Sequence, residues 1–562
     1  MIKEDIRATI VGSLTDLQEK GSLTPGTPPP FQIEVPKDPK HGDFATNVAM
    51  ILAPQEKKNP RELAQTIAAS ITENSRDTIA ADIETVVTAG PGFINITLRK
   101  DFWREIVRRV LTLKERYGDV DLGKGKRVQI EFVSANPTGP LHVGHARGGA
   151  VGDALANVLV AAGYEVAREY YINDAGVQTE ILGKSVLARY RELFGRSVVF
   201  EDNYYQGDYV KEIAGGFKER EGDRLLAVDE SEAVSYFTQH ACREIVGQIR
   251  RDLEDFGIVF DEWFSEKSLY DEGLVDKYIE EFRERGLIYE KEGALWFDTI
   301  DYGDDKDRVV IKSDKEPTYF ASDIAYHWDK FHRRGFDIVI NIWGADHHGY
   351  VVRMKAAVKA MGIKPDNLML LLVQLVNLMR GSKPVSMSKR AGEFVTLRDV
   401  LDEVGRDAMR YFMLMRSHDS HLDFDLELAT KKSQENPVYY VQYAHARISS
   451  IRRQAAEAGI SLPADPSTVD LSPLKLPEEI ALMRFLSRLP DVIGDAATEM
   501  EPHRLIFYVF ELASQFHSYY NRNRVISEDR ALSSARLGLV VAIQTVIKKA
   551  LDITGISAPE RM

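Results

Sequence analysis

The 562-residue sequence predicts a central α/β region built on a parallel sheet, with a small α+β domain before it and an all-helical domain after it. Two strand–helix–strand units carry this prediction. Their elements are expected at 128–133, 146–162 and 166–172, and at 337–343, 353–361 and 368–375. The run 337–343 is apolar almost throughout, as in parallel strands that are buried on both faces.

The predicted domains are 1–120, 121–425 and 426–562, because a chain of this length exceeds what one core can organise. Between the two units, the charged segment 184–302 is rich in helical patterns, and we expect it to be a helical insertion. Two units split by an insertion describe a Rossmann-like fold, in which ligands bind at the carboxyl ends of the strands.

The flanking domains follow from simpler patterns. In the N-terminal domain, helices are expected at 5–20, 62–70 and 102–117, and strands at 33–35 and 93–98. This domain shows no catalytic constellation, so we interpret it as a structural or recognition module. The C-terminal domain has heptad-like apolar spacing interrupted by prolines, which predicts helices joined by turns.

Charge and composition set limits on function. The net charge of −14 argues weakly against nucleic acid, yet residues 431–562 carry 16 Lys and Arg against 15 Asp and Glu and could face a polyanion. A single cysteine, Cys242, excludes an intramolecular disulfide. The chain shows no signal-peptide pattern, and its longest apolar run is too short to span a bilayer. We expect a cytoplasmic monomer that engages neither membrane nor DNA.

The segment 136–145, NPTGPLHVGH, joins a predicted strand to a predicted helix. Backbone N–H groups at a helix N-terminus attract phosphate, and His142 and His145 add side-chain donors. Gly144 lacks a Cβ where a base or a phosphate would come close. The segment therefore predicts a nucleotide site that is neither a Walker loop nor a GxGxxG turn.

A second motif, 385–390 (VSMSKR), follows about 240 residues later. HVGH and MSKR together resemble the HIGH and KMSKS signatures of class I aminoacyl-tRNA synthetases. Further segments are similar to arginyl-tRNA synthetases in particular: HGDFATN (41–47), GPGFINI (90–96), SANPTGPLHVGHARGG (134–149), YYINDAG (170–176), GADHHGY (344–350), MSKRAGEFVTL (387–397), YYVQYAHARI (439–448) and the ending ISAPERM.

This resemblance implies ATP-dependent ligation of L-arginine to its cognate tRNA through an arginyl-adenylate, with release of pyrophosphate and AMP. It also implies that arginine is activated only when tRNA is bound. Such a reaction needs positioned positive charge rather than a protein nucleophile. The catalytic residues would be His142, His145 and Lys389, with Mg²⁺ bridging phosphate oxygens. The nucleotide-binding residues would be His142, Gly144, His145, Asp346, Met387, Ser388 and Lys389.

The second motif departs from the family pattern, because Ser386 replaces its first lysine and Arg390 its last serine. Many arginyl-tRNA synthetases lack the second lysine of this motif and carry a compensating lysine just upstream of the HIGH motif. In this chain Lys389 occupies the second-lysine position, and the upstream segment has Thr138 and no lysine. Lys389 is therefore the expected cation, with Lys383 and Arg390 as nearby alternatives.

The guanidinium group of arginine is best matched by a carboxylate that accepts two parallel hydrogen bonds. Tyr319 and Asp323 share a face if their segment is helical, and the resemblance assigns both to side-chain recognition. It also assigns Glu131 and Asn136 to substrate binding. His347 and Gln374 are further candidate polar contacts.

The C-terminal domain offers a candidate surface for the tRNA anticodon: Tyr439, Gln442, Tyr443 and Arg447. The tyrosines, with Tyr440, have helical spacing and fit either a core or a stacking face for unpaired bases. Asp407–Arg410 (DAMR) is similar to the DALR signature of the family's anticodon-binding domain.

Three alternatives stand beside this interpretation. His142 and His145 have the spacing of a metal pair, although no third ligand lies nearby on the same element, so we expect no protein-bound metal. A nucleotidyltransferase or small-molecule ligase could use the same adenylation site without tRNA, but it would not explain the helical C-terminal domain. A non-catalytic tRNA-binding paralogue would not need His142, Gly144, His145 and Lys389.

Overall fold

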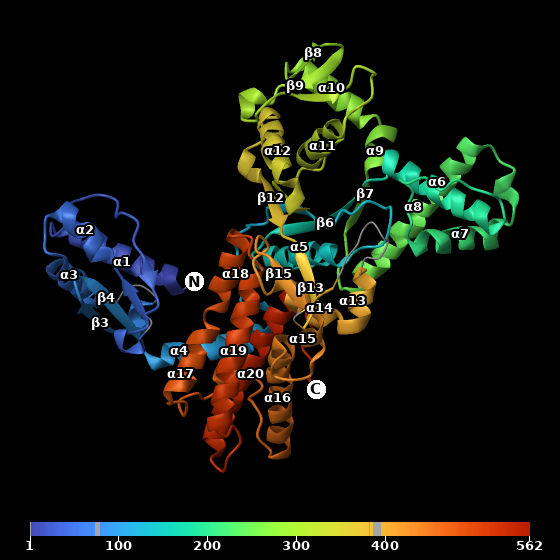
Figure 1. Ribbon diagram of the computed structural model, residues 1–562. Helices are drawn as coiled ribbons and strands as arrows, with labels where there is room; N and C mark the ends of the chain where they lie inside the picture. The colour runs from blue at the N-terminus through green and yellow to red at the C-terminus, as the bar shows by residue number, and fades with distance from the viewer. Residues whose placement is uncertain (1, 37, 74–78, 382, 386–394) are drawn as a thin grey trace.

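The computed structural model describes residues 2–36, 38–73, 79–381, 383–385 and 395–562. Figure 1 shows an N-terminal domain that stands apart, a bundle of C-terminal helices, and a central sheet that carries two lobes. Among the described residues, no helix is both long and apolar enough to cross a membrane.

The N-terminal domain has the expected α+β character. Its antiparallel sheet has the order β1-β2-β4-β3, and β4 alternates between buried and half-buried residues, as a strand with one core-facing side does. Its elements are α1 (Ile2–Glu19), β1 (Ile33–Glu34), β2 (Phe44–Thr46), α2 (Val48–Glu56), α3 (Pro60–Glu73), β3 (Ile83–Ala89) and β4 (Phe93–Leu98).

Helix α4 (Lys100–Leu113) connects this domain to the C-terminal helices. Arg104 donates to the carbonyl oxygen of Leu474 at 2.8 Å, and Arg108 donates to that of Val469 at 3.1 Å. Just beyond the helix, the Tyr117 hydroxyl group donates to the carbonyl oxygen of Leu486 at 3.0 Å. The end of the segment 1–120 is thus held by residues that come more than 350 positions later in the chain.

The central sheet confirms the Rossmann-like prediction. Its five strands are all parallel, in the order β12-β11-β5-β6-β7. They are β5 (Arg127–Glu131), β6 (Glu165–Ile172), β7 (Glu262–Ser265), β11 (Ile338–Gly344) and β12 (Leu368–Val373). When the five strands are numbered by their order in the chain, their order across the sheet is 3-2-1-4-5. Successive strands are added on one side of β5 and then on the other, so the strand order reverses between β5 and β11. Ligands are therefore expected where β5 and β11 end, at Glu131 and Gly344.

The segment 184–302 is not wholly helical, because β7 lies within it and forms the edge of the central sheet. With only four residues, β7 gave no clear periodic pattern. Before it, α6 (Val177–Leu193), α7 (Asp208–Glu221) and α8 (Glu230–Asp255) form one lobe. After it, a second lobe contains α9 (Glu266–Asp271), α10 (Leu274–Glu284), β8 (Ile288–Lys291), β9 (Ala294–Phe297), β10 (Arg308–Ile311), α11 (Tyr319–Trp328) and α12 (His348–Ala360).

The C-terminal domain is helical, as predicted, and Arg410 connects its last helix to the helix that follows β5. This fully buried side chain donates to the Asp153 carboxylate at 2.5 Å and to the carbonyl oxygen of Thr554 at 2.9 Å. The remaining elements are α5 (Val143–Ala161), β13 (Val376–Arg380), β14 (Lys383–Pro384), α13 (Leu397–Val404), α14 (Arg406–Leu414), β15 (Leu422–Asp425), α15 (Leu426–Thr430), α16 (Pro437–Glu457), α17 (Pro477–Leu486), α18 (Leu489–Thr498), α19 (His503–Arg522) and α20 (Arg530–Thr554).

Candidate active site

His142 and His145 form the N-terminal cap of α5, directly after the turn that follows β5. Nδ1 of His142 accepts from the backbone N–H of Gly144 at 3.1 Å, and Nδ1 of His145 accepts from that of His142 at 3.2 Å. The two rings stack with centroids 3.7 Å apart. In a neutral ring this pattern leaves the hydrogen on Nε2, which is the donor form that a phosphate oxygen needs. The capping also explains why α5 begins at Val143, before the predicted start at 146.

Gly144 is required by the His142 ring itself. A Cβ atom at this position would lie 2.8 Å from Cε1 of His142. Any larger residue would therefore displace the stacked histidine pair. The glycine that the sequence associates with nucleotide approach thus also shapes the cap.

The chain that follows the second motif runs beside this turn. Thr396 forms a β-bridge with His142, and the N–H of Leu397 donates to the carbonyl oxygen of Leu141 at 2.7 Å. Met387, Ser388 and Lys389 lie outside the described residues, so their predicted roles rest on the sequence. Lys383 lies on β14 and is exposed.

Tyr319 and Asp323 lie one turn apart on α11, as predicted. Asp323 is half-buried and accepts a hydrogen bond from the hydroxyl group of Tyr350 on α12. Burial raises the pKa of Asp323 to about 6, against the opposing effect of the Tyr350 hydrogen bond. Tyr319 is 62% exposed and borders a cavity of about 250 Å³, together with Gln178 of α6.

Glu266 is a second acid in this region that the sequence analysis did not single out. It begins α9 directly after β7, is 2% exposed, and accepts from the Ser322 hydroxyl group at 2.9 Å. Burial raises its pKa to about 7, and the negative charges of Asp323 and Asp174 add to this effect. Because β7 was not predicted, a lone glutamate in a charged segment carried no signal of burial.

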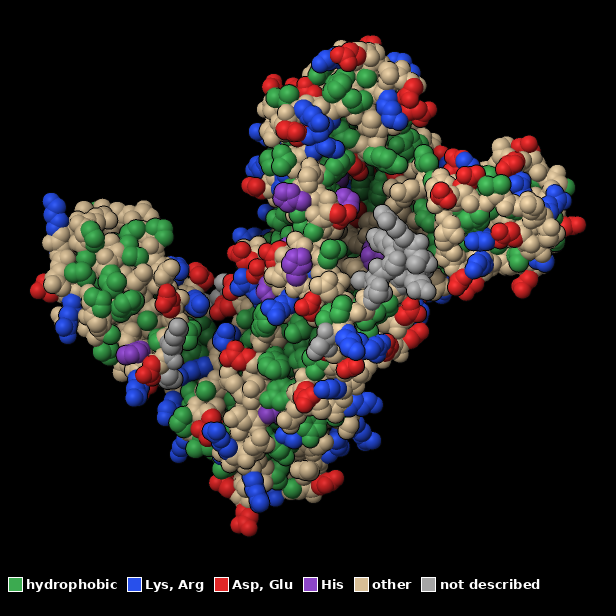
Figure 2. Space-filling model, in the orientation of Figure 1, with side chains coloured by type: hydrophobic (Ala, Val, Ile, Leu, Met, Phe, Trp, Pro, Cys, Tyr) green, Lys and Arg blue, Asp and Glu red, His purple; other side chains and the backbone are tan. Residues whose placement is uncertain are grey.

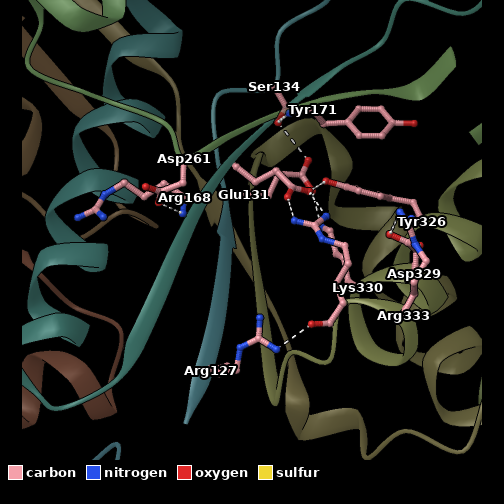
Figure 3. Close-up of polar contacts among 12 residues, drawn as sticks. Arg127, Glu131, Ser134, Arg168, Tyr171, Asp261, Tyr326, Asp329, Lys330 and Arg333 are labelled. Carbon is pink, nitrogen blue, oxygen red and sulfur yellow. Dashed lines mark hydrogen bonds and ion pairs between the residues drawn. The ribbon is translucent and has the colours of Figure 1, made fainter. Parts of the chain in front are cut away.

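Glu131 is buried at the end of β5, within the cluster of polar side chains in Figure 3. Its Oε2 atom accepts from the Lys330 ammonium group at 2.7 Å, and its Oε1 atom accepts from the Ser134 hydroxyl group at 3.1 Å. Asn136, five residues on, is exposed and donates to the side-chain oxygen of Gln178 at 2.7 Å. Glu131 is thus a fixed carboxylate, whereas Asn136 reaches the helix that borders the Tyr319 cavity.

The remaining predicted contacts lie toward the rim. The side chains of Asp346 and His347 are 81% and 57% exposed and pair with each other at 3.3 Å. Gln374, just after β12, is held through its backbone, which donates to His418 at 2.9 Å and accepts from Arg147 at 3.0 Å. Arg147, fully buried on α5, thereby connects the first motif to the loop after β12.

Figure 2 shows that the surface is hollowed between the lobe of α6–α8 and the lobe that contains α11 and α12. The N-terminus of α5 follows the carboxyl end of β5, and the acid Glu266 begins α9 directly after β7.

On α16, Tyr439, Tyr443 and Arg447 form a half-buried stack. The Tyr439 and Tyr443 rings are 6.2 Å apart at an angle of 10°, and the Arg447 guanidinium lies 4.5 Å from the Tyr443 ring centroid. Gln442 differs from the expectation, because it is buried and its amide donates to Asp407 at 2.8 Å. It connects α16 to the DAMR segment rather than facing solvent.

Comparisons with known proteins agree along the whole chain. Family models match in order: "Arginyl tRNA synthetase N terminal domain" at 2–98, "tRNA synthetases class I (R), catalytic domain" at 106–425 and "DALR anticodon binding domain" at 441–562. The arginine–tRNA ligase of Syntrophotalea carbinolica is 53% identical over 561 residues, covering 100% of both chains. That of Heliobacterium modesticaldum is 49% identical, covering 100% of this chain and 99% of its own.

The chain belongs to the arginyl-tRNA synthetase family. A solved structure titled a putative arginyl-tRNA synthetase from Campylobacter jejuni has a TM-score of 0.76 and 37% identity, covering 83% of this chain and 100% of its own. Thermus thermophilus arginyl-tRNA synthetase shares the fold over 100% of both chains, with a TM-score of 0.76 and 23% identity. The resemblance predicted from the motifs, including the class I catalytic domain, is confirmed for the arginyl-tRNA synthetase family.

Proposed function

We propose that the arginine–tRNA ligation of this family takes place here between two groups of residues at the carboxyl end of the sheet. The acids of α9 and α11 bind the arginine side chain, and the histidine cap of α5 binds the triphosphate of ATP. The observation that carries this division is that two acids meet between α9 and α11: Ser322, the neighbour of Asp323 in the chain, donates to the buried Glu266 carboxylate at 2.9 Å, and the negative charge of Asp323 raises the pKa of Glu266.

The acid pair suits a guanidinium group for an electrostatic reason. Two carboxylates held near each other at reduced solvent exposure are unfavourable when both are ionised. A guanidinium group offers planar, bidentate hydrogen bonds to carboxylates and cannot lose its proton at neutral pH. Arginine therefore relieves the repulsion between Asp323 and Glu266, whereas a neutral side chain leaves both acids without a counter-charge.

At the other end of the substrate, Glu131 provides a carboxylate for the α-ammonium group, with Asn136 beside it. Gln374, His347 and Tyr319 are further polar contacts around the same hollow. The substrate carboxylate then attacks the α-phosphorus of ATP, and the bond to pyrophosphate breaks. A terminal hydroxyl group of tRNA next attacks the acyl carbon of the adenylate, and AMP leaves.

His142, His145 and the N-terminus of α5 hold the phosphates in line for this displacement. Gly144, Asp346, Met387, Ser388 and Lys389 complete the proposed nucleotide site. Among the described residues, no three His, Cys, Asp or Glu side chains gather as a metal site would require. Mg²⁺ would then be bound chiefly by the phosphate oxygens of ATP, whose charge it would reduce.

In the C-terminal domain, Tyr439, Tyr443 and Arg447 are the proposed stacking face for tRNA bases. Gln442 would support this face from behind through Asp407. A cytoplasmic location and a monomeric state remain predictions from the sequence.

The experiment that tests this function is arginine-dependent exchange of pyrophosphate into ATP, measured with and without tRNA. We expect robust exchange with tRNA and near-background exchange without it. Equal exchange without tRNA would refute the tRNA requirement and favour a ligase that does not use tRNA. tRNA binding without any exchange would instead indicate a non-catalytic paralogue.

A further inference from the structure

Lys330 is a fully buried lysine next to the proposed arginine site. It lies in a π-helical turn, Asp329–Arg333, between α11 and β11. Its ammonium group donates to Glu131 at 2.7 Å and to the side-chain oxygen of Asn341 at 3.2 Å, and it lies 4.0 Å from the centroid of the Tyr326 ring. These three contacts match the three hydrogens of the group, so Lys330 is a fully satisfied buried cation. Figure 3 shows Lys330 beside Glu131 and Tyr326.

The hydrogen bonds continue from Lys330 to the backbone of Asp323. The Asn341 amide nitrogen is 2.8 Å from Nε2 of His327, and Nδ1 of His327 is 2.7 Å from the carbonyl oxygen of Asp323. A carbonyl oxygen only accepts, so Nδ1 carries the hydrogen and Nε2 accepts from Asn341. Burial and the charge of Lys330 lower the pKa of His327 to about 3, so this ring stays neutral at physiological pH.

On its other side, Glu131 is held by the turn that follows β5. The Ser134 hydroxyl group donates to Glu131 at 3.1 Å and accepts from the N–H of Tyr171 at 3.1 Å. Val133 and Ser134 have φ angles of 69° and 40°, which L-residues rarely adopt. Such backbone strain persists only where the surroundings impose it, and it is concentrated at functional sites. Both oxygen atoms of Glu131 are therefore fixed in direction.

We propose that Lys330 is a positioning residue that acts through Glu131: it balances the charge of this carboxylate and fixes its direction toward the α-ammonium group of arginine. This inference rests on the proposed role of Glu131. Without Lys330, the pocket would hold three uncompensated carboxylates, Glu131, Asp323 and Glu266, against a substrate with two positive groups and one negative group. Lys330 balances the charge of Glu131. It also fixes the orientation of the Glu131 carboxylate, so that the lone pairs not used by Lys330 and Ser134 point in a defined direction.

The π-helical turn explains how one short segment places this charge. A π-helical turn contains one more residue than an α-helical turn, and such turns recur at functional sites. Here the turn points Lys330 at the end of β5, while the half-buried Arg334, just after it, forms a separate ion pair with the buried Glu169 of β6. Lys330 and Arg334 thus pair with acids on two different strands. Of these two cations, only Lys330 contacts Glu131.

A double-mutant cycle with Lys330→Met and Glu131→Gln tests the inference by aminoacylation kinetics of the full chain. Lys330→Met alone should raise KM for arginine about tenfold or more, as expected when a hydrogen bond to a charged group is lost. In the Glu131→Gln background the same substitution should change this KM by less than about twofold, because the residue through which it acts is already altered.

Arg334→Met is the matched control, since it also removes from this segment a cation that pairs with a buried carboxylate. It should lower the melting temperature comparably to Lys330→Met and leave KM for arginine unchanged. Asn341→Leu is a second variant that keeps the Lys330–Glu131 pair but removes the other acceptor of Lys330, so that the cation is less firmly fixed. It should raise KM for arginine by a smaller factor, and it keeps the test decisive if Lys330→Met does not fold.

Inhibition by δ-guanidinovalerate, which is arginine without its α-amino group, shows on which end of the substrate Lys330 acts. Its inhibition constant should be nearly the same in the wild-type chain and in Lys330→Met. An equal rise in this constant and in KM for arginine would overturn the inference, as would an equal effect of Lys330→Met in both Glu131 backgrounds. If Glu131→Gln leaves KM for arginine unchanged, the proposed role of Glu131 fails first, and the inference fails with it.

Discussion

Tyr350 on α12 donates a hydrogen bond to the carboxylate of Asp323 on α11, so one helix fixes the acid that its neighbour presents. The donated hydrogen engages one carboxylate oxygen, Oδ2. Oδ1, with the nearby carboxylate of Glu266, can then accept from a guanidinium group. The Asp323 carboxylate is thereby held in one orientation before the substrate binds. This reduces the conformational entropy that the side chain loses on binding.

Asp323→Ala should abolish aminoacylation at low arginine while ATP still binds. The substitution leaves a partly buried cation without its partner, a cost of roughly 3–5 kcal/mol. The measurement is KM for arginine together with the Kd of ATP. Asp346→Ala is the comparison: this residue, whose side chain is 81% exposed at the rim, is a proposed nucleotide contact, so its loss should change the Kd of ATP rather than KM for arginine. A near-normal KM for arginine in Asp323→Ala would remove Asp323 from the site.

Arginine binding should weaken as pH falls from about 8 to 6. The pKa of Asp323 is raised to about 6 and that of Glu266 to about 7, both by burial, so the free enzyme takes up protons across this range. Arginine pairs with the ionised acids, and protonation therefore competes with it. KM for arginine against pH is the measurement, and Glu266→Gln should remove the upper step. A profile that stays flat down to pH 6 would show that neither acid binds the substrate.

The same two carboxyl groups should make the fold less stable as pH rises. A carboxyl group whose folded pKa is raised binds its proton more tightly in the folded state. The stabilising contribution of such a group is present when the pH is below its pKa in the unfolded chain. It is lost as the pH rises through its pKa in the folded chain, which is about 6 for Asp323 and about 7 for Glu266. Glu266→Gln should accordingly raise the melting temperature at pH 8 relative to the wild-type chain, with little difference at pH 4.5. A lower melting temperature at pH 8 would contradict this account of Glu266.

Lys389→Ala should lower kcat for adenylate formation by on the order of 10²–10³, the loss typical of one preorganised donor to a developing charge. KM for ATP and arginine should change little, since the interaction forms mainly in the transition state. The prediction rests on the sequence, because Lys389 lies outside the described residues. Lys383→Ala, on the exposed strand β14, is the control and should be far milder. The reverse order of effects would make Lys383 the cation.

Tyr443→Ala should raise KM for tRNA and leave KM for ATP unchanged. Loss of one base stack costs about 1–3 kcal/mol. Tyr411, a buried tyrosine of α14, provides the comparison, since Tyr411→Ala should lower the melting temperature without a selective effect on tRNA. If Tyr443→Ala behaves in that same way, the α16 tyrosines are core residues.

The sequence predicted the helices and strands that are long enough to show a clear hydrophobic period. It missed features that depend on contacts between residues far apart in the chain. The apolar strands and the helices between them identified the Rossmann-like sheet, and with it the carboxyl end at which sheets of this type bind ligands. The four residues of β7 were too few to be recognised, and Glu266 was missed with them. The sequence correctly placed His142 in the turn between a strand and a helix, and it correctly predicted that Tyr319 and Asp323 share a face of one helix. It could not show that Gln442 is buried against Asp407, or that Lys330 lies against Glu131, because these pairs are 35 and 199 residues apart.

The initial rate of tRNA charging with arginine, compared with citrulline at equal concentration, tests the central claim most directly. Citrulline has nearly the same shape but carries a neutral urea group, so it cannot balance the charges of Asp323 and Glu266. We predict charging with arginine and discrimination against citrulline on the order of 10³–10⁵, because the site would leave buried acids unpaired. Comparable charging with both amino acids, or no charging with arginine, would contradict the account.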